Sequence, residues 1–227
     1  MATTAQISAF INLIAPIIQA ECKSRGYNYP SAIIAQACCE SAYGTSLLGY
    51  KYHNYFGMKC GSSWKGKSVN LTTKEEYTTG TLTTIKDNFR VYDTDEEGVA
   101  GYFDFISASR YQNLKNATSS KNYLELIKSD GYATSSTYVS TVYGIVTKYN
   151  LTQYDDMSSV KPVDVDIVRK VLAGELGNGA SRQANVTALG YSYSEVQKKV
   201  NEIVTIASTV KPLKKELGDY WELIDLV

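Results

Sequence analysis

Residues 67 to 93 form the stretch of the chain whose composition predicts β structure, and this limits the folds that the chain can adopt. The segment KSVNLTTKEEYTTGTLTTIKDNFRVYD is rich in Thr, Val and Tyr and has Thr-Thr-Gly at its middle. Such residues favour strands, and a short turn between two strands predicts a β-hairpin. Helical spacing dominates on both sides, so the expected fold class is mainly α (α+β), with helices around one β-hairpin.

Apolar residues at helical spacing mark a long first helix over residues 4 to 23, which Pro16 is expected to kink. Pro30 and Ser31 open a second helix, which is expected to end at Gly44. A loop-rich stretch, YHNYFGMKCGSSWKGK, follows it. After the hairpin, further helices are expected near residues 95 to 108, 120 to 129 and 134 to 149.

A break in the helical pattern separates a second region from the first. Residues 151 to 163 are polar, contain Pro162 and lack periodicity, so a linker is expected there. Beyond it, glycines punctuate three short helices. The expected domains are therefore residues 1–152, a linker at 153–163, a three-helix region at 164–208 and a helical tail at 209–227.

The charge balance and the first residues argue against several partners and locations. The 227 residues carry 23 Lys and Arg and 23 Asp and Glu, so no net field favours nucleic acid or an anionic membrane. The start MATTAQISAF lacks the basic segment of a signal peptide, so neither a signal peptide nor a membrane span is expected. The four cysteines form no Cys-x-x-Cys pair and are expected to be reduced thiols in a protein made in a cytoplasm.

The sequence also lacks the residue patterns of common cofactor sites. His53 is the single histidine, so a zinc site that needs two histidines is excluded. Cys38 and Cys39 lie towards the C-terminal end of the second expected helix, where the helix dipole does not lower the pKa of a thiol, so neither is expected to be a nucleophile. No glycine-rich phosphate loop follows a strand. The expectation is a protein without a metal or an organic cofactor.

Glu40 is the single charged residue in QACCESAYGTSLLGY, and two interpretations of it remain open. In the last turn of a helix, unpaired carbonyl groups disfavour the carboxylate, and apolar neighbours would add a desolvation penalty. Both effects hold the proton and suit a general acid. Alternatively, Glu40 is an exposed charge on a polar helix face. Glu75 and Glu76 of the hairpin offer a second carboxylate across a groove, as in many glycosidases, or are solvated hairpin charges.

Four motifs, in this order, resemble glycoside hydrolase family 73, the bacterial and phage cell-wall N-acetylglucosaminidases, over roughly residues 5 to 152. They are AQACCESAYGTS, HNYFGMK, the hairpin pattern GKSV…EEYTTG…FRVYD, and GYATSSTYVSTVYGIV. The resemblance implies a lysozyme-like helical catalytic domain, with the hairpin as the second wall of a groove. It further implies that Glu40 protonates the glycosidic oxygen and that Tyr132 lies beside the catalytic centre. The segment that matches the groove floor is Asn54, Tyr55, Phe56 and Gly57.

The hairpin acid of that family can be matched to either of two adjacent residues. Adjacency to Tyr77 favours Glu76 as the second catalytic carboxylate, whereas strand parity with Val69 favours Glu75, which is otherwise expected to contact substrate. A β-bulge would reconcile the two patterns. The family's mechanism allows water attack assisted by this Glu or participation by the acetamido group of the substrate.

Residues 166 to 201, DIVRKVLAGELGNGASRQANVTALGYSYSEVQKKVN, resemble the helical cell-wall-binding repeat first associated with pneumococcal phage lysozymes. Leu176 stands where that pattern usually has Trp. By the resemblance, five residues contact muropeptides, although Tyr191 and Gln197 could instead hold three short helices together. The five residues are Asp166, Arg182, Tyr191, Gln197 and Asn201.

Together the two resemblances imply a phage endolysin, an endo-β-N-acetylglucosaminidase that cleaves peptidoglycan after N-acetylglucosamine and binds the cell wall through its C-terminal repeat. It is expected to accumulate in the host cytoplasm until a holin releases it to the wall. The alternatives are a muramidase or lytic transglycosylase of similar shape, and a catalytically inactive wall-binding protein. Peptidoglycan is the expected partner, and a homo-oligomer formed through the C-terminal region is compatible with the sequence.

Overall fold

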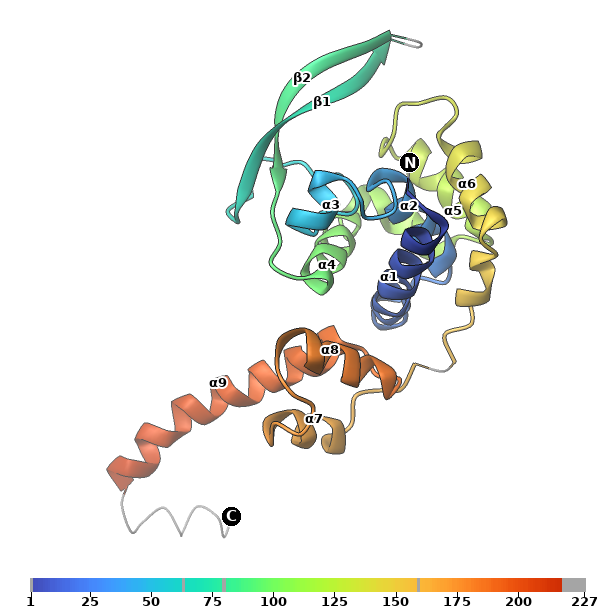
Figure 1. The fold of residues 1–227 in the computed structure, drawn as a ribbon. Helices are drawn as coiled ribbons and strands as arrows, with labels where there is room; N and C mark the ends of the chain where they lie inside the picture. The colour runs from blue at the N-terminus through green and yellow to red at the C-terminus, as the bar shows by residue number, and fades with distance from the viewer. Residues whose placement is uncertain (1, 63, 79–80, 159, 218–227) are drawn as a thin grey trace. The chain divides into compact units, whose positions relative to one another are not determined.

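A computed structural model describes residues 2–62, 64–78, 81–158 and 160–217 of the chain. The chain divides into two compact units, Met1–Val160 and Lys161–Val227. Both units are helical, and the strands named in the described ranges form one hairpin in the first unit (Figure 1). The expected mainly α fold with a β-hairpin is confirmed.

The N-terminal unit packs its helices around a buried central helix, α2 (Pro30–Glu40), whose residues from Pro30 to Cys38 are all buried. Its neighbours are α1 (Thr4–Arg25), α5 (Ser120–Ser129), α6 (Tyr138–Lys148) and the 3₁₀-helix η2 (Leu151–Tyr154). The remaining elements are α3 (Leu47–Tyr52), strands β1 (Ser68–Thr78) and β2 (Thr81–Arg90), α4 (Asp95–Ile106) and the 3₁₀-helix η1 (Ser109–Asn116).

The first helix, α1, combines a capping box, an internal proline and a left-handed end. Thr3 and Gln6 form the capping box, and Gly26, with a φ of 77°, ends the helix. Pro16 lies inside the helix, as expected. By length and composition α1 is apolar enough to cross a membrane, but half of its most apolar window is buried inside the unit. Its burial is that of a core helix.

A carboxylate from a distant part of the chain fixes the start of α2. Tyr29, at the N-cap position, makes no side-chain hydrogen bond to the helix. Instead, Asp155 accepts hydrogen bonds from the backbone N–H and from the Oγ of Ser31, both at 2.9 Å. The Ser31 Oγ also lies 2.6 Å from the Oγ of Ser120 on α5. These bonds hold η2 and α5 at the start of the helix that ends at Glu40.

The second helix ends earlier than the expected end at Gly44. Ala42, Tyr43 and Gly44 have φ angles of 50°, 58° and 72°, so α2 stops at Glu40 and a left-handed turn follows. The Ser41 Oγ stabilises this turn, because it donates to a carbonyl oxygen in the last turn of α2 at 2.6 Å and accepts from the Gly44 N–H at 2.7 Å. The turn directs the chain away from the core directly after the acid.

The base of the hairpin is joined to the segment that precedes it. β1 and β2 pair antiparallel from Ser68 opposite Arg90 up to the turn. The Arg90 N–H donates to the Met58 carbonyl oxygen at 2.9 Å, and the Cys60 N–H donates to the Asn88 carbonyl oxygen at 2.7 Å. Residues 58 to 60 therefore run alongside the end of β2, which fixes the hairpin against the helical body (Figure 1).

Up to residue 217, where the described part of the C-terminal unit ends, the unit contains three helices, α7 (Val165–Leu172), α8 (Gly179–Ala188) and α9 (Tyr193–Leu217). Its small core consists of Ile167, Val168, Val171, Val186, Val196 and Val200. Three short helices were expected up to residue 208, but the third continues without a break to Leu217. The rest of the expected tail, residues 218–227, lies outside the described residues.

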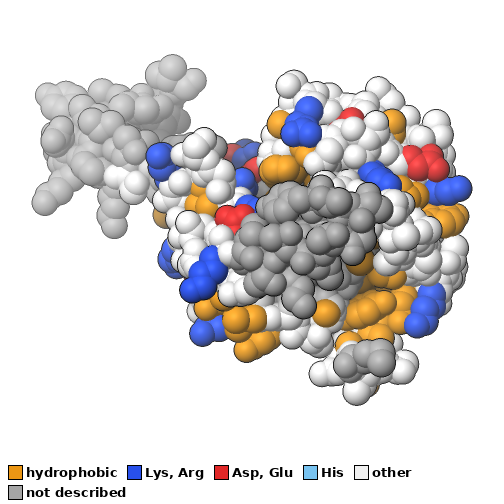
Figure 2. Space-filling view, turned by 90° about the horizontal axis from the view of Figure 1, so that it is seen from above, with side chains coloured by type: hydrophobic (Ala, Val, Ile, Leu, Met, Phe, Trp, Pro, Cys, Tyr) orange, Lys and Arg blue, Asp and Glu red, His pale blue; other side chains and the backbone are white. Residues whose placement is uncertain are grey.

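On the face drawn in Figure 2, blue Lys and Arg side chains are scattered among orange hydrophobic ones rather than collected in one patch.

Candidate active site

An open groove lies in the N-terminal unit beside the end of α2, with a volume of about 660 Å³. That volume is in the range of small-molecule and cofactor sites. Its walls come from α2, the segment after α3, the end of β2, α4, η1, the loop before α6 and the start of α6. The side chains that matter for its chemistry are Glu40, Phe56, Arg90, Arg110, Tyr132 and Tyr138.

Glu40 is the last residue of α2, and its carboxylate faces the groove. Its place in the last turn agrees with expectation, and of the two interpretations left open by the sequence, its exposure agrees with a charge on the exposed face rather than with a carboxylate among apolar neighbours. Cys38 is buried, Cys39 is half-buried and Glu40 is exposed. The physical reason is that the buried stripe of α2 ends at Cys38, so the final residue projects from the helix end into the groove.

Two tyrosines lie beside Glu40. Burial is the main cause that raises the pKa of the Tyr132 and Tyr138 phenols, and the Glu40 carboxylate is the next cause for both. The Tyr132 hydroxyl donates to the Phe56 carbonyl oxygen at 3.0 Å, and the Tyr138 hydroxyl accepts from Gln36 Nε2 at 2.7 Å. Tyr132 was predicted from the sequence, whereas Tyr138 was not.

A buried hydrogen-bond network joins Tyr138 to the core of the N-terminal unit. Gln36, one turn before Glu40 on α2, accepts at its Oε1 from the Tyr102 hydroxyl at 2.8 Å. The Tyr102 and Tyr123 hydroxyls are 2.9 Å apart. Tyr102 also stacks on Phe56, with ring centroids 4.1 Å apart. The network joins α2, α4 and α5 to the groove floor and so limits how far the floor can shift relative to Glu40.

The four residues predicted to line the groove floor divide into two pairs. Phe56 and Gly57 line the groove. Asn54 does not: it is 1% exposed, and its amide bonds the Met58 N–H, the Met58 carbonyl and the Arg90 carbonyl. Tyr55 is 4% exposed and donates its hydroxyl to Asp95. Asn54 and Tyr55 therefore hold the floor in place from inside the fold instead of contacting a ligand.

The hairpin acids are described only through the backbone of β1, because the side chains of Glu75 and Glu76 lie outside the described residues. Glu75 pairs with Thr83 and Glu76 with Leu82, in unbroken register from Ser68. The irregularity falls between Glu76 and Thr78. A bulge at that place does not change how residues 75 and 76 alternate relative to Val69, so the choice between the two acids stays a prediction.

Basic residues on the groove wall were missed by the sequence analysis. The Arg90 guanidinium lies 4.6 Å from the centroid of the Trp64 ring, and its Nε donates to the Lys59 carbonyl oxygen at 3.1 Å. Arg110 donates to the Asp130 carbonyl oxygen. A guanidinium can bind planar acceptors such as carboxylates with two parallel bonds. No local sequence pattern predicts these residues, because they come from separate elements that meet only in the folded groove.

Three of the five predicted wall-binding residues are hydrogen-bonded in a row in the C-terminal unit. Arg182 Nη1 donates to Gln197 Oε1 at 3.1 Å, and Gln197 Nε2 donates to Asn201 Oδ1 at 2.8 Å, which links α8 to α9. The Tyr191 hydroxyl donates to Asp164 at 2.6 Å. Asp166 is exposed and pairs with Arg169 at 2.7 Å. The structure thus brings Arg182, Gln197 and Asn201 together and leaves Tyr191 and Asp166 outside that chain of bonds.

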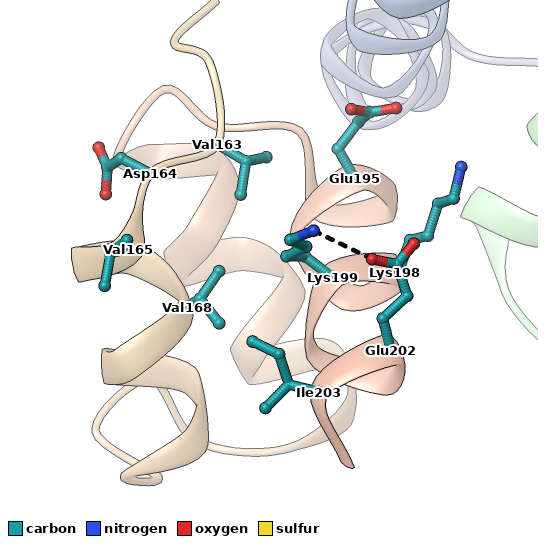
Figure 3. Close-up of a pocket in the computed structure, with 9 residues that line it drawn as sticks. All are labelled: Val163, Asp164, Val165, Val168, Glu195, Lys198, Lys199, Glu202 and Ile203. Carbon is teal, nitrogen blue, oxygen red and sulfur yellow. Dashed lines mark hydrogen bonds and ion pairs between the residues drawn. The ribbon is translucent and has the colours of Figure 1, made fainter. Parts of the chain in front are cut away.

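A second hollow, of about 380 Å³, lies between α7 and α9 of the C-terminal unit. Figure 3 shows Val168 and Ile203 directed towards the space between the two helices, and Val165 at the start of α7 also lines the hollow. Charged residues of α9 surround it, and Lys199 pairs with Glu202 at 3.1 Å. None of the five residues predicted to bind the wall is among those that line it.

Residues 15–151 match the family model described as mannosyl-glycoprotein endo-beta-N-acetylglucosaminidase, the glucosaminidase family. The chain belongs to the glucosaminidase family. The match takes in Glu40, Phe56, Tyr132 and the hairpin, so the groove lies within the glucosaminidase domain. Residues 166–204 match a second model, the CW_7 repeat, which covers α7, α8 and the first half of α9.

Several known proteins are similar to this chain. Exo-glucosaminidase LytG of Bacillus subtilis is 33% identical over 144 residues, which are 60% of this chain and 50% of that protein. A probable N-acetylmuramidase of Lactococcus lactis is 34% identical over 166 residues, 70% of this chain and 37% of that one. The catalytic domain of the autolysin Auto from Listeria monocytogenes is 31% identical, with a TM-score of 0.57, over 68% of this chain and 90% of that structure. The chain spans half or less of the length of these two curated relatives.

The thiols of the glucosaminidase domain are unpaired. Cys22 and Cys38 are buried, while Cys39 and Cys60 are half-buried. Burial raises the pKa of Cys38 to about 12, and burial followed by the Glu40 carboxylate raises the pKa of Cys39 to about 11. Thiols with such pKa values are poor nucleophiles near neutral pH. Among the described residues, no group of three His, Cys, Asp or Glu side chains is placed to hold a metal ion.

Proposed function

We propose that this protein is a peptidoglycan hydrolase that cleaves the glycan bond after N-acetylglucosamine, with Glu40 as the general acid. The observation that carries the proposal is the position of Glu40 at the end of α2, facing a groove of about 660 Å³ and flanked by Tyr132 and Tyr138. Membership of the glucosaminidase family supports a glycan substrate. The similarity to exo-glucosaminidase LytG supports cleavage at a glucosamine residue of that glycan.

In the proposed reaction, Glu40 gives its proton to the glycosidic oxygen, the bond to the anomeric carbon breaks, and the leaving sugar departs as an alcohol. A water molecule then adds to the anomeric carbon, and its proton passes to a base. Glu76, with Glu75 as the alternative, is that base in one route. In the other, the acetamido oxygen of the substrate first bonds the anomeric carbon, and water opens this intermediate with Glu40 taking the proton.

Because Glu40 is exposed, substrate binding is also expected to change its protonation. A carboxylic acid must keep its proton near neutral pH to act as a general acid. A glycan seated in the groove would exclude water from Glu40 and disfavour its ionised form, because desolvation penalises charge. The helix-end carbonyl groups of α2 act in the same direction. The acid is then prepared for proton transfer in the complex with substrate.

The test compares the wild type with Glu40→Gln on purified peptidoglycan, with loss of turbidity as the readout. Glutamine keeps the size of the side chain but cannot deliver the proton, so activity is expected to fall by about 100-fold or more. Glu125→Gln is the matched control, because Glu125 is an exposed residue of α5 that pairs loosely with Lys121 at 3.8 Å. Full activity of folded Glu40→Gln would remove the catalytic assignment.

A muramidase that cuts the other glycan bond is the second candidate, because a relative with 34% identity is named a probable N-acetylmuramidase. Analysis of the new reducing ends separates the two. Terminal N-acetylglucosamine is expected. Terminal N-acetylmuramic acid, or its anhydro form, would assign a muramidase or a lytic transglycosylase instead.

We further propose that the protein is a phage endolysin that accumulates in the host cytoplasm until a holin gives it access to the wall. The unpaired thiols, two of them buried, support synthesis in a reducing compartment. The CW_7 repeat supports delivery to the cell wall. Expression inside a susceptible host should cause lysis only when a holin is co-expressed, and lysis at the same rate without the holin would contradict this assignment.

A further inference from the structure

The long helix α9 carries a heptad repeat. Apolar residues recur along it at alternating steps of four and three, which is the spacing of the a and d positions of a coiled coil. Valine, isoleucine and leucine occupy every d position, and the a positions hold Val200, Ala207 and Lys214. The d positions are Val196, Ile203, Val210 and Leu217.

The core of the repeat uses only the beginning of this stripe. Val196 and Val200 are 1% and 5% exposed, packed in the small core of the unit. One turn further on, Ile203 and Val204 are 37% and 52% exposed. The match to the CW_7 repeat also ends at residue 204, whereas the helix continues to Leu217. The apolar stripe therefore continues beyond the core of the CW_7 repeat, into residues 205–217, which the repeat match does not include.

That segment has a poor intrinsic tendency to be helical alone. NEIVTIASTVKPLKKEL, residues 201–217, holds six β-branched residues and Pro212, all of which disfavour a helix. A helix of this length is marginal in water even with favourable residues. Packing of its apolar stripe against another surface would supply the missing stability.

We propose that this stripe is a self-association surface and that its partner is α9 of a second copy of this chain. A heptad pattern is complementary to itself, because each a or d side chain fits between four residues of an identical helix. Lys214, the single polar residue at these a and d positions, costs stability but restricts register and oligomer size, the role attested for polar residues at a positions. Pro212 falls at an f position, outside the seam.

The hollow between α7 and α9 extends the same surface. Val165 and Leu172 of α7 are 71% and 48% exposed, and Val165 shares the hollow with Ile203 (Figure 3). Three acidic residues, Asp164, Glu195 and Glu202, and two basic ones, Lys198 and Lys199, surround it. Charges of both signs around the hollow allow opposite charges of two copies to face each other. The dimer would present two CW_7 repeats to the wall, which increases binding through effective concentration.

The test is the mass of the full chain by light scattering or sedimentation equilibrium, at protein concentrations from about 1 to about 100 µM. The wild type is expected to rise from the 25.1 kDa of one chain towards twice that mass. Val210→Asp places a charge at a d position and should hold the mass at one chain. Thr209→Asp is the matched control, since it changes a β-branched residue to the same charge at position c, outside the seam, and should behave as wild type.

A third variant, Lys214→Leu, removes the polar residue from its a position and should shift association to lower concentration by about tenfold or more, the change expected when a coiled-coil seam becomes fully apolar. A wild type that stays at one chain throughout the range would overturn the proposal. Equal dissociation by Val210→Asp and Thr209→Asp would also overturn it, because the effect would then not depend on the seam. Wild-type turbidity loss by both Asp variants checks that the glucosaminidase domain is intact.

Discussion

Glu96 lies in the first turn of α4, and its side chain is buried inside the protein. It is 5% exposed, and both of its carboxylate oxygens are buried. Burial is the main cause that raises the pKa of Glu96 to about 6. Its own backbone N–H, Thr94 and His53 oppose the rise, and Asp95 adds to it. His53 Nδ1 lies 2.7 Å from Asp95 Oδ1. The fold therefore includes a carboxyl group whose ionised form is unfavourable.

Glu96→Gln is expected to stabilise the protein at pH 7.5. The pKa is raised in the folded state, so the contribution of Glu96 to stability is complete below its unfolded pKa of about 4.5 and is lost as the pH rises through about 6. At neutral pH the loss amounts to about 2 kcal/mol, which glutamine avoids. Urea unfolding at pH 4.5 and pH 7.5 measures the difference. A gain of the same size at both pH values would show that ionisation is not its cause.

A second prediction at the level of single residues concerns the second catalytic carboxylate. Glu76→Gln should reduce turbidity loss by about 100-fold if Glu76 assists the attacking water. Glu75→Gln, at the adjacent position of β1, should change it by less than about tenfold, since a substrate contact contributes less than a general base. The reverse order would assign the role to Glu75. Equal and small effects of both variants would favour participation by the acetamido group.

Some features of the groove residues could be predicted from the sequence, and others could not. The last-turn position of Glu40 was predictable, because apolar spacing defines α2 and its end. The exposure of Glu40 was one of two interpretations that the sequence left open, because it depends on a left-handed turn in which Ala42 and Tyr43, neither a glycine, have positive φ. Tyr138 and Arg110 were missed because they meet Glu40 only through the packing of separate elements.

Helix α4 lies so close to His53, at the end of α3, that a side chain at Gly98 does not fit. A Cβ added there would lie 1.9 Å from the His53 carbonyl oxygen. His53 ends α3 in a left-handed conformation, with a φ of 51°, and directly precedes the floor segment that begins at Asn54. The contact of α4 with this segment therefore helps to hold the groove floor.

Gly98→Ala is accordingly expected to destabilise the N-terminal unit by about 3 kcal/mol, because the added carbon must displace backbone. Gly144→Ala on α6 is the matched control. Nothing lies within 4 Å of its added Cβ, so alanine should stabilise that helix by about 0.5 to 1 kcal/mol. Thermal unfolding of both variants gives the comparison. A neutral Gly98→Ala would mean that α4 can move away from His53 at little cost.

Elements with strong local patterns were predicted well, and those that depend on distant contacts were not. The hairpin follows from its Thr, Val and Tyr content, and α5 from its apolar spacing. The six-residue helix α3 is too short for periodicity to reveal. The start of α2 depends on Asp155, 124 residues after Ser31, and no local pattern carries such information.

For the whole molecule, the two units have separate apolar cores. The core of the N-terminal unit is formed by residues from Phe10 to Leu151, and that of the C-terminal unit by residues from Ile167 to Val200. Each unit can therefore be stable without the other. This separation agrees with a division of labour in which the glucosaminidase domain cleaves glycan and the CW_7 repeat binds the wall.

Removal of residues 161–227 should then affect the two activities differently. Turnover of soluble glycan fragments is expected to stay within about twofold of wild type, because the groove lies entirely in the N-terminal unit. Pelleting with intact cell walls should fall by about tenfold or more, since one of two linked binding sites is lost. Arg182→Ala in the full chain, which breaks the bond to Gln197, should reproduce part of this loss if the predicted residues contact muropeptides. Equal pelleting by the full and shortened chains would assign wall binding to the groove alone, and the repeat would then require another partner.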